Sequence, residues 1–214
     1  MTPKQIFYIY EAVAFLFAIS VHESAHAWTA MRCGDPTAYM LGRVTLNPIK
    51  HIDPFGTILM PLIGIFTGFG IFGWAKPTPV NPRNFKKVVK YDILTSVAGP
   101  LSNLIVATLS VLGMAIVKII AHGEPSPESG LFPVWALLDA FMEINVLLAV
   151  FNILPIPPLD GSHVVRHLLP AGAVRAFDYL GMFGIILIFW FGGPIIGAMM
   201  SPFLAVFQSL LAKV

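Results

Sequence analysis

Four stretches of this chain run for more than twenty residues with no more than two charged residues each: 6–31, 93–120, 132–154 and 177–211. About 20 apolar residues in a helix cross the roughly 30 Å hydrocarbon core of a bilayer, so each stretch is long enough to span a membrane. The chain is 57% hydrophobic and only 11% charged, and a water-soluble domain of this size cannot bury that much apolar surface. The sequence therefore predicts an all-α, polytopic membrane protein.

The last apolar stretch is longer than a single crossing needs. A Gly-Gly-Pro sequence divides it at residues 192–194, and both residue types disfavour the interior of a helix. We therefore expect two helices there. With the first three stretches they give a bundle of five spanning helices in one domain, residues 1–214. The expected spans are about 6–31, 93–120, 132–154, 175–191 and 194–211.

One further apolar segment, residues 57–74, is interrupted by Pro61 and several glycines. If it enters and leaves the membrane on one side, 11 of the 13 lysines and arginines share that side, and only Lys4 and Lys118 lie opposite. Cytoplasmic loops carry an excess of Lys and Arg. We therefore expect a re-entrant segment, with the N-terminus outside and the C-terminus in the cytoplasm. The expected location is the plasma membrane.

The first apolar stretch contains the sequence HESAH, at a depth where polar groups are costly. His22 and His26 are four residues apart, so they lie on one face of a helix and can present both imidazoles to one metal ion. Glu23 lies about 100° further round the helix and can reach a water molecule without binding the metal. Zinc suits two imidazoles and a carboxylate, and it lowers the pKa of water at an open fourth position. The motif predicts a metallopeptidase with one zinc per chain and Glu23 as general base.

Other interpretations of this motif stay open. The histidines can simply connect packed helices, or the stretch can be a signal peptide with AHA at 25–27 as its cleavage site, although Glu11 interrupts the apolar core. The cluster can also be the permeation site of a metal transporter or channel, but the chain shows no internal repeat and such a site does not need Glu23. A helix-binding scaffold without activity would lack the glutamate. Nothing in the composition supports nucleic-acid binding.

The third metal ligand must come from elsewhere in the chain. The candidates are Asp35, His51, Asp53, Asp92, Asp139, Glu143, Asp160, His163 and His167. His22 follows Ile6 by 16 residues, which places it roughly 24 Å below the outer edge of the core, nearer the cytoplasmic leaflet. The stretch 132–154 ends on that same side, just before PIPPLDG, whose prolines cannot continue a helix. Depth and sidedness therefore favour Asp160.

Three motifs together resemble the site-2 protease family of intramembrane zinc metalloproteases: HESAH at 22–26, AGPLSN at 98–103 and NILPIPPLDG at 152–161. They stand in family order and spacing, and no segment resembles a PDZ or CBS module. The resemblance implies zinc on His22, His26 and Asp160, and cleavage of a transmembrane segment of another protein in the lipid bilayer. It also implies that GRVTLNP, residues 42–48, belongs to a small β-element that an unwound substrate joins as a strand.

Two asparagines, Asn103 and Asn152, lie in these motifs inside expected spanning helices. They can connect helices by hydrogen bonds, but the family motifs favour a role in binding the substrate backbone or the developing oxyanion. His163, Arg166 and His167 share one face of a short segment after Asp160, and we expect that face to lie at the membrane interface. The sequence predicts neither the substrate's identity nor an oligomeric state.

Overall fold

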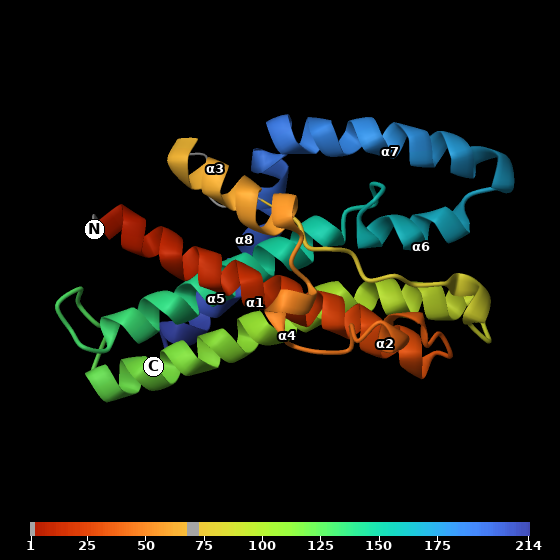
Figure 1. The fold of residues 1–214 in the computed structure, drawn as a ribbon. Coiled ribbons are helices and arrows are strands. Elements are labelled where there is room, and N and C mark those ends of the chain that lie inside the picture. Colours follow the sequence, from red (N-terminus) through yellow and green to blue (C-terminus); the bar gives the residue numbers. More distant parts are fainter. Residues whose placement is uncertain (1–2, 68–72) are drawn as a thin grey trace.

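The computed structural model describes residues 3–67 and 73–214, which form a bundle of helices (Figure 1). Among these residues there is no strand, and α1, α4, α5 and α8 are apolar and long enough to cross a membrane. The all-α membrane fold is therefore confirmed. The helices are α1 (Pro3–Arg32), α2 (Thr37–Met40), α3 (Met60–Thr67), α4 (Val88–Ala121), α5 (Phe132–Asn152), α6 (Asp160–Leu168), α7 (Ala171–Phe191) and α8 (Gly193–Leu211), with 3-10 turns η1 (Pro48–Lys50) and η3 (Pro82–Asn84) and the π-helical η2 (Pro54–Leu59).

The centre of the bundle consists of α1, α4 and α5, which pack against one another. Ala14 and Ala18 of α1 are fully buried, and they belong to one apolar cluster with Ala140 of α5. Small side chains of this kind let two helices approach closely, which is how helices associate in lipid. This packing brings the C-terminal half of α1, with the HESAH motif, against α4 and α5.

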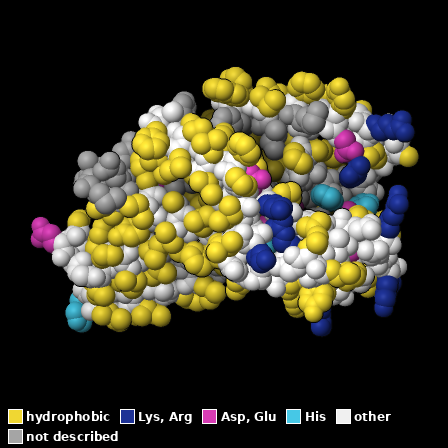
Figure 2. Space-filling model, viewed as in Figure 1, with side chains coloured by type: hydrophobic (Ala, Val, Ile, Leu, Met, Phe, Trp, Pro, Cys, Tyr) yellow, Lys and Arg dark blue, Asp and Glu magenta, His cyan; other side chains and the backbone are white. Residues whose placement is uncertain are grey.

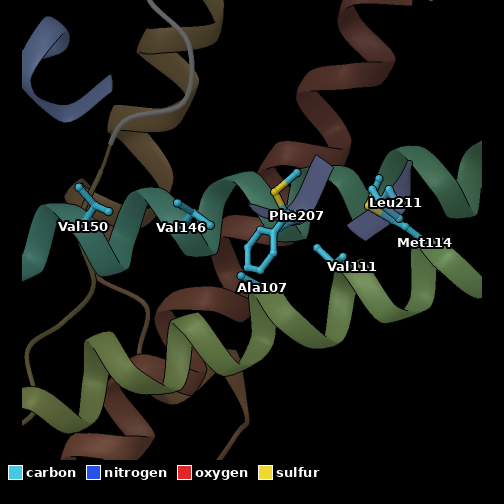
Figure 3. Close-up of a cluster of buried hydrophobic side chains, with 8 residues drawn as sticks. Ala107, Val111, Met114, Val146, Val150, Phe207 and Leu211 are labelled. Atoms are coloured by element: carbon cyan, nitrogen blue, oxygen red, sulfur yellow. The ribbon is translucent and has the colours of Figure 1, made fainter. Parts of the chain in front are cut away.

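A second apolar cluster joins α4, α5 and α8 (Figure 3). Phe207 of α8 packs with Ala107 of α4 and Val146 of α5, and Leu211 belongs to the same cluster. Lys118, in the last turn of α4, donates a hydrogen bond of 2.7 Å from its Nζ to the backbone oxygen of Leu211. The C-terminal end of α8 therefore lies at the end of the bundle where α4 ends.

This packing disagrees with the expected path of the last apolar block. We expected helices over 175–191 and 194–211 to cross in opposite directions and to leave the C-terminus opposite the N-terminus. Instead, α7 doubles back from α6 and meets α8 at Gly192, and both chain ends lie at one end of the bundle (Figure 1). The five expected spans are not confirmed. Hydropathy permits either path because each half has enough residues to cross, 21 in α7 and 19 in α8; the packing of Phe207 and Leu211 distinguishes them.

Residues 42–48 do not form the expected β-element. The backbone oxygen of Thr45 accepts hydrogen bonds from Ser24 Oγ of α1 and from His51 Nε2, the latter at 2.8 Å. Side chains thus satisfy a backbone group that a neighbouring strand would otherwise pair. The segment leads through turns into η1 without entering a sheet.

The expected re-entrant segment, residues 57–74, has its two ends joined. Thr57 Oγ1 donates a hydrogen bond of 2.8 Å to the backbone oxygen of Trp74. The apolar helix Pro54–Thr67 forms the first part of this segment. Its about 14 residues extend only about 21 Å, which is less than the thickness of the hydrocarbon core. Residues 68–72 lie outside the described part of the chain. A segment that begins and ends at one depth has the geometry that a re-entrant segment requires.

Candidate active site

Three side chains from α1 and α6 converge on one point. Asp160 Oδ2 lies 3.1 Å from His22 Nε2 and 3.3 Å from His26 Nε2, and the two Nε2 atoms lie 3.0 Å apart. Ligands at 2.0–2.1 Å from a tetrahedral zinc ion stand about 3.3 Å from one another. The structure thus brings the two motif histidines and the aspartate of PIPPLDG to distances that suit one metal ion.

The contacts of the Nδ1 atoms of His22 and His26 determine which nitrogen of each ring carries a proton. His26 Nδ1 lies 2.7 Å from the backbone oxygen of Thr95, which can only accept, so Nδ1 is the donor in the neutral ring. His22 Nδ1 lies 2.6 Å from Asn103 Oδ1. Both Nε2 atoms then direct lone pairs at Asp160 Oδ2, which is buried and has no hydrogen-bond donor. Three acceptor atoms therefore face one another with no proton between them, and such an arrangement suits a bound cation.

A proline-rich turn after α5 carries Asp160 to this point. Gly161 allows the turn to close, because a Cβ there would lie against the backbone oxygen of Ile153 and 2.6 Å from that of Leu154. A metal ligand of this kind must be deprotonated, so Asp160 would bind a metal ion as a carboxylate.

The α4 helix leaves room for the imidazoles at Gly99. A Cβ at this position would lie against His26 Nε2 and 2.7 Å from His22 Nε2. Any side chain at Gly99 would therefore take the space in which the two nitrogens meet. This close approach explains the glycine of AGPLSN.

Glu23 lines the cavity at this site but is not part of the metal-ligating group. The backbone amide of Thr78 donates a hydrogen bond of 2.7 Å to Glu23 Oε2, and Thr78 Oγ1 donates one of 3.0 Å to the backbone oxygen of Glu23. Asp35, fully buried after α1, holds the same segment by accepting from Asn81 N and Asn84 Nδ2, both at 2.7 Å. The glutamate therefore has a fixed orientation beside the histidines.

The two motif asparagines occupy different environments. Asn152 lines the cavity, which has a volume of about 750 Å³, and its Nδ2 donates to the backbone oxygen of Leu148 at 2.9 Å. Asn103 is fully buried, and its Nδ2 donates to the backbone oxygen of Ala18 at 3.2 Å and to Asn145 Oδ1 at 2.7 Å. Asn152 is thus placed where a substrate can reach it, whereas Asn103 contacts His22. Neither Asn145 nor the backbone of Thr78 carries a signal in the sequence.

The histidines of α6 contact a carboxylate of α4, and the expected membrane-interface face of this helix stays a prediction. His167 Nε2 and His163 Nδ1 lie 2.7 and 3.2 Å from Oδ2 of Asp92, a buried carboxylate of α4 that needs such partners. This contact outweighs burial and raises the pKa of His163. Arg166 pairs with Asp178 of α7 at 2.7 Å. The two contacts with Asp92 hold α6, and with it Asp160, against α4.

Comparison with known proteins assigns the chain to a family. The family model described as peptidase family M50 matches residues 114–191. The protein YwhC of Bacillus subtilis, a zinc metalloprotease by name, is 38% identical over 177 residues, which cover 83% of this chain and 77% of the relative. The chain belongs to peptidase family M50. The resemblance seen in the three motifs is thereby confirmed, and the chain is a membrane-embedded zinc metalloprotease.

More distant M50 relatives come from mycobacteria, and they too are zinc metalloproteases by name. Rip2 of Mycolicibacterium smegmatis is 29% identical over 182 residues, which cover 85% of this chain and 65% of the relative. Rip2 of Mycobacterium tuberculosis is 31% identical over 160 residues, which cover 73% of this chain and 56% of the relative. No solved structure gives a significant match.

Proposed function

We propose that His22, His26 and Asp160 hold the zinc ion of this M50 protease and that Glu23 is its general base. The reaction is hydrolysis of a peptide bond in or near a transmembrane segment of another membrane protein. The observation that carries the proposal is the convergence of two Nε2 atoms and one carboxylate oxygen, without a proton donor, on the wall of the cavity that Glu23 also lines.

The residues divide the chemistry among them. Zinc bound by His22, His26 and Asp160 would supply a Lewis acid that polarises a water molecule and the carbonyl group of the scissile bond. Glu23 takes the proton from this water at Oε1, since Thr78 engages Oε2, and the water oxygen bonds to the carbonyl carbon. As the C–N bond breaks, Glu23 gives the proton to the departing amine nitrogen. The products are a carboxyl group and an amine.

The substrate must be extended at the cleavage point, because a helix shields its own peptide bonds. Segment 73–80 offers an edge for such a chain. The amides of Trp74, Lys76 and Thr78 bond inward to the rest of the protein. Alternate residues of an extended segment face opposite directions, so the backbone groups of Ala75 and Pro77 face away from these contacts. Together with Asn152 on the cavity wall, they can bind the freed backbone groups of the substrate.

We place the N-terminus outside the cell and the active site nearer the cytoplasmic leaflet of the plasma membrane. Lysines and arginines gather toward one end of the face in Figure 2, while hydrophobic side chains cover much of the rest. The contact between Lys118 at the end of α4 and Leu211 at the end of α8 supports a C-terminus on the same side as the loop between α4 and α5, and therefore on the side of the N-terminus. Lys213 then joins Lys4 and Lys118 outside, and ten of the 13 basic residues remain on the cytoplasmic side.

The decisive experiment measures zinc content and cleavage of a transmembrane test substrate on the same detergent-purified variants. Glu23→Gln removes the base but keeps all three proposed ligands, so zinc should stay near one per chain while cleavage falls by at least about 100-fold. Asp160→Asn should lose zinc and activity together, because an amide is a poor zinc ligand. Replacing both histidines by alanine should abolish zinc binding.

Two results would contradict the proposal. Loss of zinc from Glu23→Gln would make Glu23 a ligand instead of a base. Full cleavage by this variant would show that Glu23 is not the general base.

A further inference from the structure

The Nδ1 atoms of His22 and His26, on the side of each ring away from the proposed zinc site, have different hydrogen-bond partners. His26 donates from Nδ1 to the backbone oxygen of Thr95, which cannot exchange an acceptor for a donor. His22 instead meets the side-chain amide of Asn103, which presents either an oxygen or an NH2 group when it turns by 180°. The proton position on His22 is therefore secure only if something fixes the amide of Asn103.

We infer that Asn145 of α5 is a positioning residue that sets the proton on His22 through Asn103; the inference rests on the proposed role of His22 as a zinc ligand. Asn145 is fully buried and is not among the residues that line the cavity. It therefore acts on the reaction without touching substrate.

The amide of Asn103 has its orientation dictated by two acceptors. Its Nδ2 lies 3.2 Å from the backbone oxygen of Ala18 and 2.7 Å from Asn145 Oδ1. Both hydrogens of the NH2 group are used there, so only Oδ1 remains for His22. If the amide turned over, its oxygen would meet those two acceptors and leave buried acceptors without donors, which is unfavourable.

The orientation of Asn145 is dictated in turn by the backbone. Its Nδ2 donates a hydrogen bond of 2.8 Å to the backbone oxygen of Phe141, which can only accept. Its Oδ1 must then face Asn103. A chain of hydrogen bonds thus runs from a carbonyl of α5 through two amides to His22 Nδ1, and it leaves Nε2 without a proton.

Without the oxygen of Asn145, the NH2 group of Asn103 keeps only its 3.2 Å contact to the backbone oxygen of Ala18. The amide can then turn its NH2 group to His22 in part of the molecules. His22 then accepts at Nδ1 and carries its proton on Nε2, where the proton points at the metal position. Zinc can bind only to the tautomer of His22 whose Nε2 has no proton. A population of the other tautomer therefore lowers the affinity for zinc.

The test uses the full-length protein in detergent, with zinc affinity measured by competition with a chelator. Asn145→Leu has similar volume but no acceptor, and it should weaken zinc binding by about 10- to 100-fold, the usual cost of losing such a supporting partner. Asn145→Asp should keep wild-type affinity, because a carboxyl oxygen also accepts a hydrogen bond from Asn103 Nδ2. Ser110→Ala, which removes a buried hydroxyl bonded only to its own helix, should leave the affinity unchanged.

Two further measurements separate positioning from a general structural effect. The ring 15N shifts of His22 in zinc-free protein should report a proton on Nδ1 in the wild type and a mixture in Asn145→Leu. Because Asn145 acts through Asn103, the double variant Asn103→Ala with Asn145→Leu should bind zinc no more weakly than Asn103→Ala alone.

Wild-type shifts in Asn145→Leu, or additive losses in the double variant, would overturn the inference. If Asn145→Leu does not fold, Asn145→Ala removes the same acceptor without added bulk and takes its place. Retention of zinc by His22→Ala would instead remove the proposed function. Loss of zinc in His22→Ala with normal zinc affinity in Asn145→Leu would remove only this inference.

Discussion

Each of the two histidines that we propose as zinc ligands uses its two ring nitrogens for different contacts. The Nε2 atoms meet Asp160, while the Nδ1 atoms bond to Thr95 and Asn103 of α4. A partner of this kind fixes the ring and raises its basicity as a ligand. Since α4 supplies both partners, its distance from α1 determines whether the two rings can meet.

Gly99→Ala should therefore remove the metal site. Its new methyl group would lie against His26 Nε2 and His22 Nε2, so the rings must separate. We expect zinc affinity to fall by at least about 100-fold and cleavage to fall with it.

A matched control is Gly197→Ala in α8, where a Cβ meets nothing within 4 Å. It should leave zinc content and activity unchanged. Stoichiometric zinc in Gly99→Ala would show that the two helices can move apart without loss of the site.

Sequence spacing predicts the residues of the site that depend on one helix, and misses those that depend on packing. His22 and His26 are local, because four residues make about one helical turn. Asp160 required an argument from topology. The oxygen of Thr95 and the amide of Thr78 belong to the backbone, which every residue has, so no sequence pattern marks them. Asn145 lies outside every recognised motif.

At the scale of elements, α6 acts as the carrier of Asp160. It has nine residues, and a helix that short is not stable alone in water. Asp92 binds it to α4 through His163 and His167. The position of Asp160 therefore depends on contacts made by other residues of α6.

Asp92→Ala should lower zinc affinity by about 10-fold, because α6 then loses its anchor on α4. The control is Arg166→Ala on the same helix. It breaks an exposed pair with Asp178, and such pairs contribute little. Equal zinc affinities in these two variants would show that Asp92 does not position α6.

The same anchor should depend on pH. Asp92 raises the pKa of His163, so the folded protein holds this proton more tightly than the unfolded chain. The stabilisation is fully present below about pH 6.5 and fades as pH rises through the higher pKa of the folded state. Thermal unfolding in detergent should show this pH-dependent part in the wild type and not in Asp92→Ala. A pH profile shared by both proteins would contradict it.

In the molecule as a whole, α8 runs back to the end of the bundle at which α1 begins. The number of apolar helices follows from hydropathy, but the direction in which each helix runs depends on the helices against which it packs. The contacts of Phe207 with α4 and α5 bring together residues nearly sixty or more positions apart, and no local pattern shows them. For that reason the apolar segments were predictable, and the path of the last two was not.

A topology experiment tests this path. Reporters fused after Glu124 and after Val214 should read the same side of the membrane, and reporters after Lys50 and Lys87 should both read the other. Opposite readings for Glu124 and Val214 would restore the path with two crossings after α6. Opposite readings for Lys50 and Lys87 would mean that residues 57–74 cross the membrane.

The start of α1 and the end of α8 lie at one end of the bundle (Figure 1), and this arrangement bears on how the molecule can be re-engineered. If the reporters after Glu124 and Val214 read one side of the membrane, a peptide that joins the two ends would stay in one compartment. We then expect circular permutation to be tolerated, with new termini opened in the loop between α4 and α5. Two copies can likewise be fused head to tail by a hydrophilic linker that never enters lipid.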